Sequence, residues 1–263
     1  MIGIFDSGVG GLTIVKEVFK YLPKYQIIYF GDTARLPYGT KGASFVKKYS
    51  SKITDWLLQK KAKIIIIACH TSSAWASDFL KKKHKGTPIF DMISFTARDV
   101  VLSTKNKKIG IIGTPGTIKS SAWSKELKRL DPSLKVFLQS CPLFVPMVEM
   151  GFTKGQVTEK VAEEYLKKIK SENVDVLVLA CTHYPLLEKV IRKVMGPKVK
   201  IINPAKSVAK EIETFLNKNP KIEKEILKGK SHRFFFSDEP YNLEKISRIC
   251  FGKKIKAKII DPF

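Results

Sequence analysis

Two stretches of the chain share one order of apolar and polar positions. Ile64–Ala74 reads IIIIACHTSSA and Val176–Leu187 reads VLVLACTHYPLL, so each has an aliphatic run of strand character, then Ala-Cys, then polar residues that lead into a helix. A second pair, Ile2–Gly11 and Ile109–Ile118, has a buried-strand pattern that breaks into a turn rich in glycine and hydroxyl groups. The two pairs are offset by 112 and 107 positions, which indicates a diverged duplication.

Strand and helix patterns alternate through both halves. The predicted strands are Ile2–Phe5, Gln26–Phe30, Ile64–Ala68, Pro88–Met92, Ile109–Ile112, Lys135–Leu138 and Val176–Ala180. Helices are predicted from the apolar stripes within Leu12–Leu22, Phe45–Leu57, Ser72–Lys85 and Val157–Ile169. This order predicts an α/β fold of two pseudo-symmetric, doubly wound domains with mainly parallel sheets, in which ligands bind beyond the carboxyl ends of the strands.

The chain after about Ala205 has no counterpart in the first half. Its patterns are two helices, a strand at Arg233–Phe236, a helix near Tyr241–Cys250 and a last apolar run at Ile255–Ile260. We expect this tail to pack on the first domain, with the chain passing into its second half around Ser94–Thr104. The expected domains are residues 1–96 with 206–263, and residues 97–205, with the active site between them.

Three chemistries are open to Cys69 and Cys181, which follow the two matching strands. A redox disulfide is one, although no dithiol-enzyme spacing is present. A metal site is another, because His70 and His183 would complete a set of two thiolates and two imidazoles. The third is two-base proton transfer, in which one thiolate takes a proton from a carbon and the opposite thiol returns one to the other face. We favour the third, and we expect these cysteines to be tuned towards thiolate near neutral pH.

The turn Asp6–Gly11, with the sequence DSGVGG, precedes a predicted helix and suits an anion. Glycines allow backbone amides to approach a ligand, and a helix amino terminus favours negative charge. The spacing fits neither a dinucleotide fingerprint nor a P-loop, so the expected anion is a carboxylate. We expect the side chains of Asp6 and Ser7 to face the same ligand site. The polar loop Gly31–Gly39 follows the next predicted strand, where site residues are also common.

The composition adds a formal net charge of +24, from 42 Lys and six Arg against 24 Asp and Glu. The lysines are spread over every predicted helix and turn without a nucleic-acid motif, so we interpret them as a solvated surface and expect no nucleic-acid partner. Without an apolar run of about 18 residues or a signal peptide, we expect no membrane association and a cytoplasmic protein. Cys141 and Cys250 are predicted to be ordinary buried thiols, since no cysteine spacing fits a disulfide scaffold or zinc ribbon.

Four motifs in one order resemble those of glutamate racemase, the cofactor-independent enzyme that makes D-glutamate for bacterial peptidoglycan. They are DSGVGGLT at Asp6–Thr13, GDTARLPYG at Gly31–Gly39, CPLFVPMVE at Cys141–Glu149 and ACTHYPLL at Ala180–Leu187. The resemblance covers essentially the whole chain, including FFFSDEP at Phe234–Pro240. It implies two α/β domains with the active site between them and Cys69 and Cys181 as the catalytic acid/base residues.

The resemblance also implies the remaining site residues. Substrate contacts are implied at Asp6, Ser7, Tyr38, Gly39, His70, Thr71, Thr114, Thr117, Thr182 and His183. Asp6 on the Cys69 side and His183 beside Cys181 are implied to take part in catalysis, with Asp32 and Glu149 as supporting residues. The expected partner is glutamate, no metal or other cofactor is expected, and we expect a homodimer.

One position departs from the family motif. Where the family has Ala-Cys-Asn-Thr, this chain has Ala68-Cys69-His70-Thr71, so an imidazole replaces a substrate-binding amide. Imidazole can donate or accept a hydrogen bond, but it is larger and can be charged. Ala180 also replaces the usual glycine before the second cysteine. Racemisation of another acidic amino acid such as aspartate, and a weakened relative that acts as a basic binding protein, are the alternatives.

Overall fold

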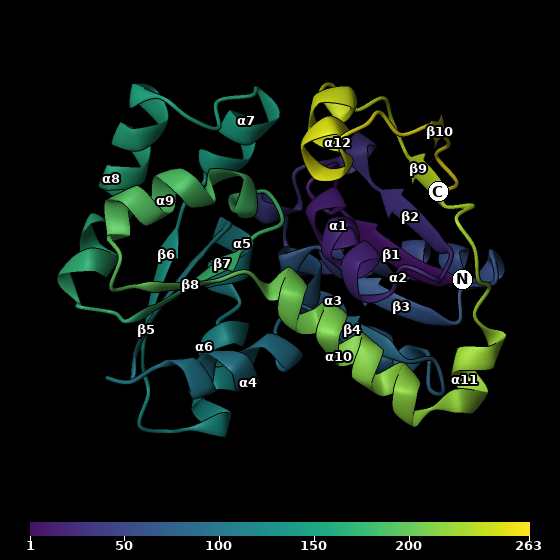
Figure 1. Ribbon diagram of the computed structural model, residues 1–263, viewed down its shortest axis with the longest axis horizontal. Coiled ribbons are helices and arrows are strands. Elements are labelled where there is room, and N and C mark those ends of the chain that lie inside the picture. Colours follow the sequence, from purple (N-terminus) through teal and green to yellow (C-terminus); the bar gives the residue numbers. More distant parts are fainter.

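Ten strands form two sheets, and the computed structural model describes residues 1–263 (Figure 1). The strands are β1 (Ile2–Asp6), β2 (Ile27–Gly31), β3 (Ile64–Ile67), β4 (Ile89–Asp91), β5 (Lys108–Gly113), β6 (Lys135–Ser140), β7 (Val176–Ala180), β8 (Lys200–Ile202), β9 (Arg233–Phe236) and β10 (Ala257–Ile259). The sheet orders are β10-β9-β2-β1-β3-β4 and β6-β5-β7-β8, and all their strand pairs are parallel. The order β2-β1-β3-β4 is repeated as β6-β5-β7-β8, so the predicted α/β fold with matching halves is confirmed.

Helices cover both faces of each sheet (Figure 1). They are α1 (Leu12–Tyr21), α2 (Ala43–Gln59), α3 (His70–Lys83), α4 (Ser94–Ser103), α5 (Pro115–Lys119), α6 (Ala122–Leu130), α7 (Phe144–Glu149), α8 (Gln156–Ser171), α9 (Glu188–Met195), α10 (Pro204–Lys218), α11 (Pro220–Glu225) and α12 (Leu243–Phe251). Short 3-10 turns occupy Thr33–Arg35, Tyr38–Thr40 and Tyr184–Leu187.

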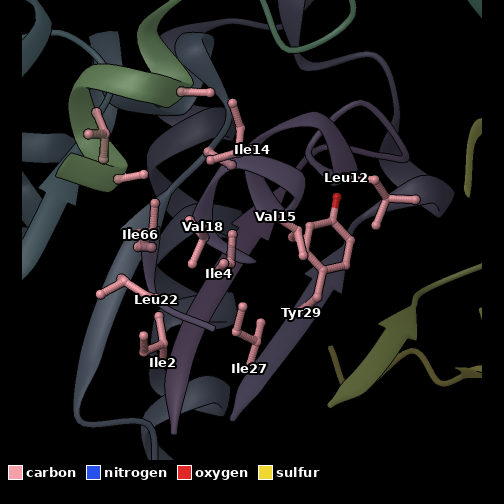
Figure 2. Close-up of a cluster of buried hydrophobic side chains, with 14 of the residues drawn as sticks. Ile2, Ile4, Leu12, Ile14, Val15, Val18, Leu22, Ile27, Tyr29 and Ile66 are labelled. Carbon is pink, nitrogen blue, oxygen red and sulfur yellow. The ribbon is translucent and has the colours of Figure 1, made fainter. Parts of the chain in front are cut away.

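The first sheet is buried on both faces, which explains why β1 and β3 read as continuous apolar runs. Ile4 and Ile66 point to the face under α1, α10 and α12, while Phe5 and Ile67 point to the face under α2 and α3. Figure 2 shows the first of these cores, where Val15 and its neighbours on α1 lie over β1 and β2. Each fully buried aliphatic side chain stabilises the fold by about 1.5–3 kcal/mol.

The second sheet repeats this arrangement with different helices. Val176 and Val178 of β7 join the core under α4 and α6, and Leu177 and Leu179 join the core under α8 and α9. Cys181 continues the second of these faces at the carboxyl end of the strand. Each sheet is therefore a rigid base that fixes where its strand ends point.

Some local predictions were wrong or incomplete. Ser94–Ser103 is a helix with buried Ala97 and Val100. From the sequence we expect only that the chain passes there from its first half into its second. α3 begins at His70 rather than at Ser72. Val157, which the apolar pattern places in the packed stripe of α8, is 62% exposed, whereas its neighbour Thr158 is buried.

The tail adds β9 and β10 to the first sheet, where β9 pairs with β2. The bounds proposed for the two domains stay a prediction. No helix combines the length and apolar character that crossing a bilayer requires.

Candidate active site

The carboxyl ends of the central strands from both sheets meet at one pocket. Asp6 ends β1, Cys69 follows β3, Thr114 follows β5 and Cys181 follows β7. A small pocket of about 20 Å³ is lined by both cysteines. One cysteine comes from each sheet, so each half of the chain contributes a thiol to the pocket.

Cys69 lies at the amino terminus of α3 and is buried. Its Sγ is 3.8 Å from the Ser7 hydroxyl. Burial, with a further contribution from the Asp6 charge, raises the pKa of Cys69 to about 11, although the Ser72 and Ser7 contacts act in the opposite direction. The sequence-based expectation of a thiol tuned towards thiolate is therefore wrong for Cys69, which carries its proton at neutral pH.

Cys181 has a different environment, because a histidine lies beside it. The Cys181 Sγ is 3.9 Å from His183 Nδ1, and His183 Nε2 is 2.9 Å from Glu149 Oε1. Burial alone would lower the pKa of His183, but hydrogen bonds to Cys181 and Glu149, and their charges, raise it to about 10. His183 is therefore an imidazolium at neutral pH, next to the sulfur on which negative charge develops when the thiol loses its proton.

Asp6 contacts both the turn that follows β1 in the first sheet and Thr182, which follows β7 in the second sheet. Its Oδ2 accepts hydrogen bonds from the backbone amides of Gly8 at 3.1 Å and Gly11 at 3.0 Å. The Thr182 hydroxyl donates to Asp6 Oδ1 at 3.3 Å. Burial raises the pKa of Asp6, while the His183 charge and the two amides oppose that shift. A side chain at Gly10 would overlap Thr182 and His183, so this turn needs glycine for close approach.

Three threonine hydroxyls meet where the two halves touch. Thr71 Oγ1 lies 2.9 Å from Thr114 Oγ1 and 3.1 Å from Thr117 Oγ1, and the last two are 2.9 Å apart. Gly39 lies against them, because a Cβ there would meet the Thr114 side chain. A hydroxyl can both donate and accept, so this cluster can turn its protons towards a carboxylate in the pocket.

Asp32 and Tyr38 form a buried network behind the pocket. The Tyr38 hydroxyl donates to Asp32 Oδ2 at 2.5 Å, and Arg35 and Ser237 each donate to Asp32 Oδ1 at 2.8 Å. Burial and the Asp32 charge raise the pKa of Tyr38. Tyr38 lines the pocket, but its hydroxyl is already committed to Asp32, which holds the Gly31–Gly39 loop in place.

His70 packs between the halves. Its ring stacks on Trp123 of α6 at a centroid distance of 6.3 Å, and its Nδ1 is buried without a hydrogen-bond partner. Burial lowers the pKa of His70 to about 3, so the imidazole is neutral at physiological pH. The residue still contributes to the lining of the pocket.

The predicted site residues fall into two layers. Ten of them line the pocket: Ser7, Tyr38, Gly39, Cys69, His70, Thr71, Thr114, Cys181, Thr182 and His183. The other four, Asp6, Asp32, Thr117 and Glu149, lie behind the lining and contact it by hydrogen bonds. Leu36, Pro37 and Val145 also line the pocket, and the sequence analysis did not single them out although they lie within its motifs.

The redox and metal alternatives for the paired cysteines depend on how the thiols and their neighbouring side chains lie. All four cysteines are free thiols. No group of three or more His, Cys, Asp or Glu side chains is arranged to hold a metal ion. His70 lies against Trp123 instead of joining the cysteines.

Comparison with known proteins agrees with the fold. The model of the Asp/Glu/hydantoin racemase family matches residues 10–212. A glutamate racemase from Geobacter metallireducens is 41% identical over 254 residues, which are 97% of this chain and 93% of the relative. A glutamate racemase isoform from Bacillus anthracis superposes with a TM-score of 0.92 at 35% identity, over 100% of this chain and 97% of that chain.

A third similar protein was solved with a ligand. The glutamate racemase from Francisella tularensis in complex with D-glutamate superposes with a TM-score of 0.88 at 36% identity, over 99% of this chain and 97% of that chain. Fold and relatives together identify an enzyme of the isomerase class, an amino-acid racemase. The chain belongs to the Asp/Glu/hydantoin racemase family.

Proposed function

We propose that this protein interconverts L- and D-glutamate by proton transfer between Cys69, Cys181 and the α-carbon. The observation that carries the proposal is that matching strand ends of the two halves bring one thiol each to the same pocket. The relatives named as glutamate racemases, one of them solved with D-glutamate, support glutamate as the substrate.

The proposed reaction balances without an external oxidant or reductant. The thiolate of one cysteine takes the α-proton, so the C–H bond breaks and its electron pair stays on the substrate as a carbanion delocalised into the α-carboxylate. The opposite cysteine then gives its S–H proton to the other face of the same carbon. The two sulfurs exchange protonation states, and the reverse direction uses them in the opposite order.

The surroundings of the two sulfurs suggest which one begins as the base. Cys69 carries its proton because burial and Asp6 raise its pKa to about 11. The charged ring of His183 lies 3.9 Å from the Cys181 sulfur, whereas Cys69 has the Asp6 carboxyl nearby instead. We propose that Cys181 acts first as base and Cys69 as acid when the free enzyme binds one enantiomer.

Substrate binding would use the donors around the pocket. The hydroxyls of Thr71 and Thr114, with Thr117 behind them, would donate to one carboxylate. Ser7 and Thr182, with the Asp6 carboxyl behind, would hold the α-amino and α-carboxylate groups. Donors aimed at the α-carboxylate stabilise the transition state most, because charge accumulates there.

The biological role that we propose is supply of D-glutamate for peptidoglycan, in keeping with the family. A homodimer and the domain bounds given above stay predictions. Sedimentation analysis tests the first, and separate expression of residues 97–205 tests the second.

The deciding experiment is incubation with L-glutamate in D2O without added cofactor, with loss of the Cα proton followed by NMR and racemisation by optical rotation. We expect deuterium incorporation with racemisation, lost in Cys69→Ser and Cys181→Ser. Cys250→Ser is the matched control, since Cys250 is also a buried thiol but lies outside the pocket. Exchange with aspartate but not glutamate would reassign the substrate, and full activity in either site mutant would refute the two-thiol mechanism.

A further inference from the structure

A further cavity is formed by residues of the first sheet and its helices, and neither Cys69 nor Cys181 lines it. It has a volume of about 730 Å³ and is formed by α1, α12 and the segments that flank β9. Figure 1 shows α1 and α12 side by side with β9 and β10 next to them. We call it the α1–α12 groove; its size is within the range of small-molecule sites, about 300–1,000 Å³.

The rim of the groove is strongly basic. Six lysines line it, and no Asp or Glu does: Lys16, Lys20, Lys230, Lys253, Lys254 and Lys256. Lys20 pairs with Glu17 and Lys254 pairs with Glu244, while the other four have no ion-pair partner. The carboxyl ends of α1 and α12 also point here, but each helix end carries only about −0.5 charge. The positive charge of the four unpaired ammonium groups is therefore larger than the negative charge of both helix ends, and the groove attracts anions.

The floor of the groove is aromatic. Phe19 lies 4.4 Å from the His232 ring and 5.6 Å from the Phe251 ring, measured between centroids. Phe234 lies 6.2 Å from Phe251 on the same floor. Phe19 and Phe251 are only half buried, so they leave flat apolar surface open to a planar group.

His232 adds a directed polar group to this floor. Its Nδ1 accepts a hydrogen bond from the backbone amide of Ile27 at 3.3 Å. Burial, together with the charge of Lys253, lowers the pKa of His232, so the ring is neutral and carries its proton on Nε2. That N–H has no partner within the protein and is available as a donor at the groove.

We propose that the α1–α12 groove binds a nucleoside polyphosphate, with the phosphate chain among the lysines and the base on Phe19 and Phe251. A phosphate chain matches the clustered ammonium groups, and a base matches the exposed aromatic faces and the His232 donor. The floor holds two half-buried rings rather than a continuous series, so it suits one base rather than a strand of nucleic acid. This site is independent of the proposed racemisation.

The test is calorimetric titration with ATP at constant ionic strength. We expect one saturable site per chain, with tripolyphosphate and adenosine each binding more weakly than ATP because each supplies only half of the contacts. Lys253→Ala/Lys256→Ala should weaken ATP binding about tenfold, since each exposed charge contact contributes up to about 1 kcal/mol. Phe251→Leu should weaken ATP and adenosine but not tripolyphosphate.

Lys167→Ala/Lys168→Ala is the matched control, because it removes the same charge from exposed positions on α8 in the other half. If the two double variants weaken ATP binding equally, the binding reflects general attraction to a basic protein, and the proposed site is wrong. Absence of saturable ATP binding would also overturn it. Tighter binding of a single-stranded oligonucleotide than of ATP, lost in the Lys253/Lys256 variant, would assign the groove to nucleic acid instead.

Discussion

Glu149→Gln is the change that tests the electrostatics of the site most directly. Glu149 does not line the pocket and acts only through His183, whose Nε2 is 2.9 Å from the carboxylate. Glutamine keeps the size of the side chain and an oxygen acceptor, but it removes the negative charge. The variant therefore separates the charge of this pair from its geometry.

The expected magnitude follows from the pKa of His183. Its value of about 10 exceeds the ordinary 6.5 by about 3.5 units, which corresponds to about 5 kcal/mol in favour of the protonated ring. Cys181 and Glu149 share this effect. A hydrogen bond to a charged group contributes about 1.5–3 kcal/mol, so loss of the carboxylate should lower the pKa of His183 enough to reduce the protonated fraction at pH 9 about tenfold.

The assay is kcat/KM for both directions of glutamate racemisation as a function of pH, measured by circular dichroism. We expect the variant to match the wild type near pH 6.5, where both rings are protonated, and to be about tenfold slower near pH 9. The control is Glu188→Gln, which removes a carboxylate paired with Arg192 on the surface of the same half. If the fall in kcat/KM on the alkaline side of the pH profile is the same in Glu149→Gln as in the wild type, then Glu149 does not keep His183 protonated and the assignment is wrong.

The same shift predicts how stability depends on pH. The folded protein holds the His183 proton up to about pH 10, whereas the unfolded chain releases it near 6.5. The folded state therefore binds more protons in this window, and the free energy of unfolding should fall as the pH rises from 6.5 towards 10. Urea unfolding at several pH values, with a smaller slope in Glu149→Gln, checks this sign.

Further changes give distinct outcomes. Gly10→Ala should lower kcat/KM about 100-fold while the protein stays folded, because its Cβ would lie 2.4–2.5 Å from Thr182 and His183 and must displace them by about 1 Å. Steady-state kinetics and thermal melting separate the two effects. Asp32→Asn should lower the free energy of unfolding by about 3 kcal/mol, since Tyr38 and two other donors lose a buried anionic acceptor, and an unchanged urea midpoint would contradict this. For His70, whose pKa of about 3 lies below the ordinary 6.5, stability should fall as the pH drops from 6.5 towards 3, and His70→Asn should reduce that acid-side loss in urea titrations.

The strands and the turns after them could be predicted because their signal is local. The four isoleucines of β3 form a short, β-branched apolar run that favours a strand covered on both faces, and the glycines after Asp6 mark a turn. The apolar pattern that predicts a helix is weaker in α4 and α6. In α6 only Trp123 and Leu127 are buried, which is too few for a periodic pattern.

The partners of the site side chains were harder to predict, since they depend on distant elements. The family motif indicated a substrate contact at Tyr38, but its hydroxyl is bound to Asp32. His70 lies on Trp123, which is 53 positions further along the chain and in no motif. Burial also decides the protonation of Cys69, and no sequence pattern reports how completely one thiol is enclosed.

The two sulfurs occupy equivalent strand ends in unlike surroundings, one enclosed near a carboxylate and the other beside an imidazolium. In the proposed reaction, substrate and product are mirror images with equal free energies in water, so the equilibrium constant is unity. The Haldane relation then requires kcat/KM to be the same in both directions. The asymmetry between Cys69 and Cys181 can therefore change kcat only together with KM, and the direction with the higher turnover must also have the proportionally higher KM.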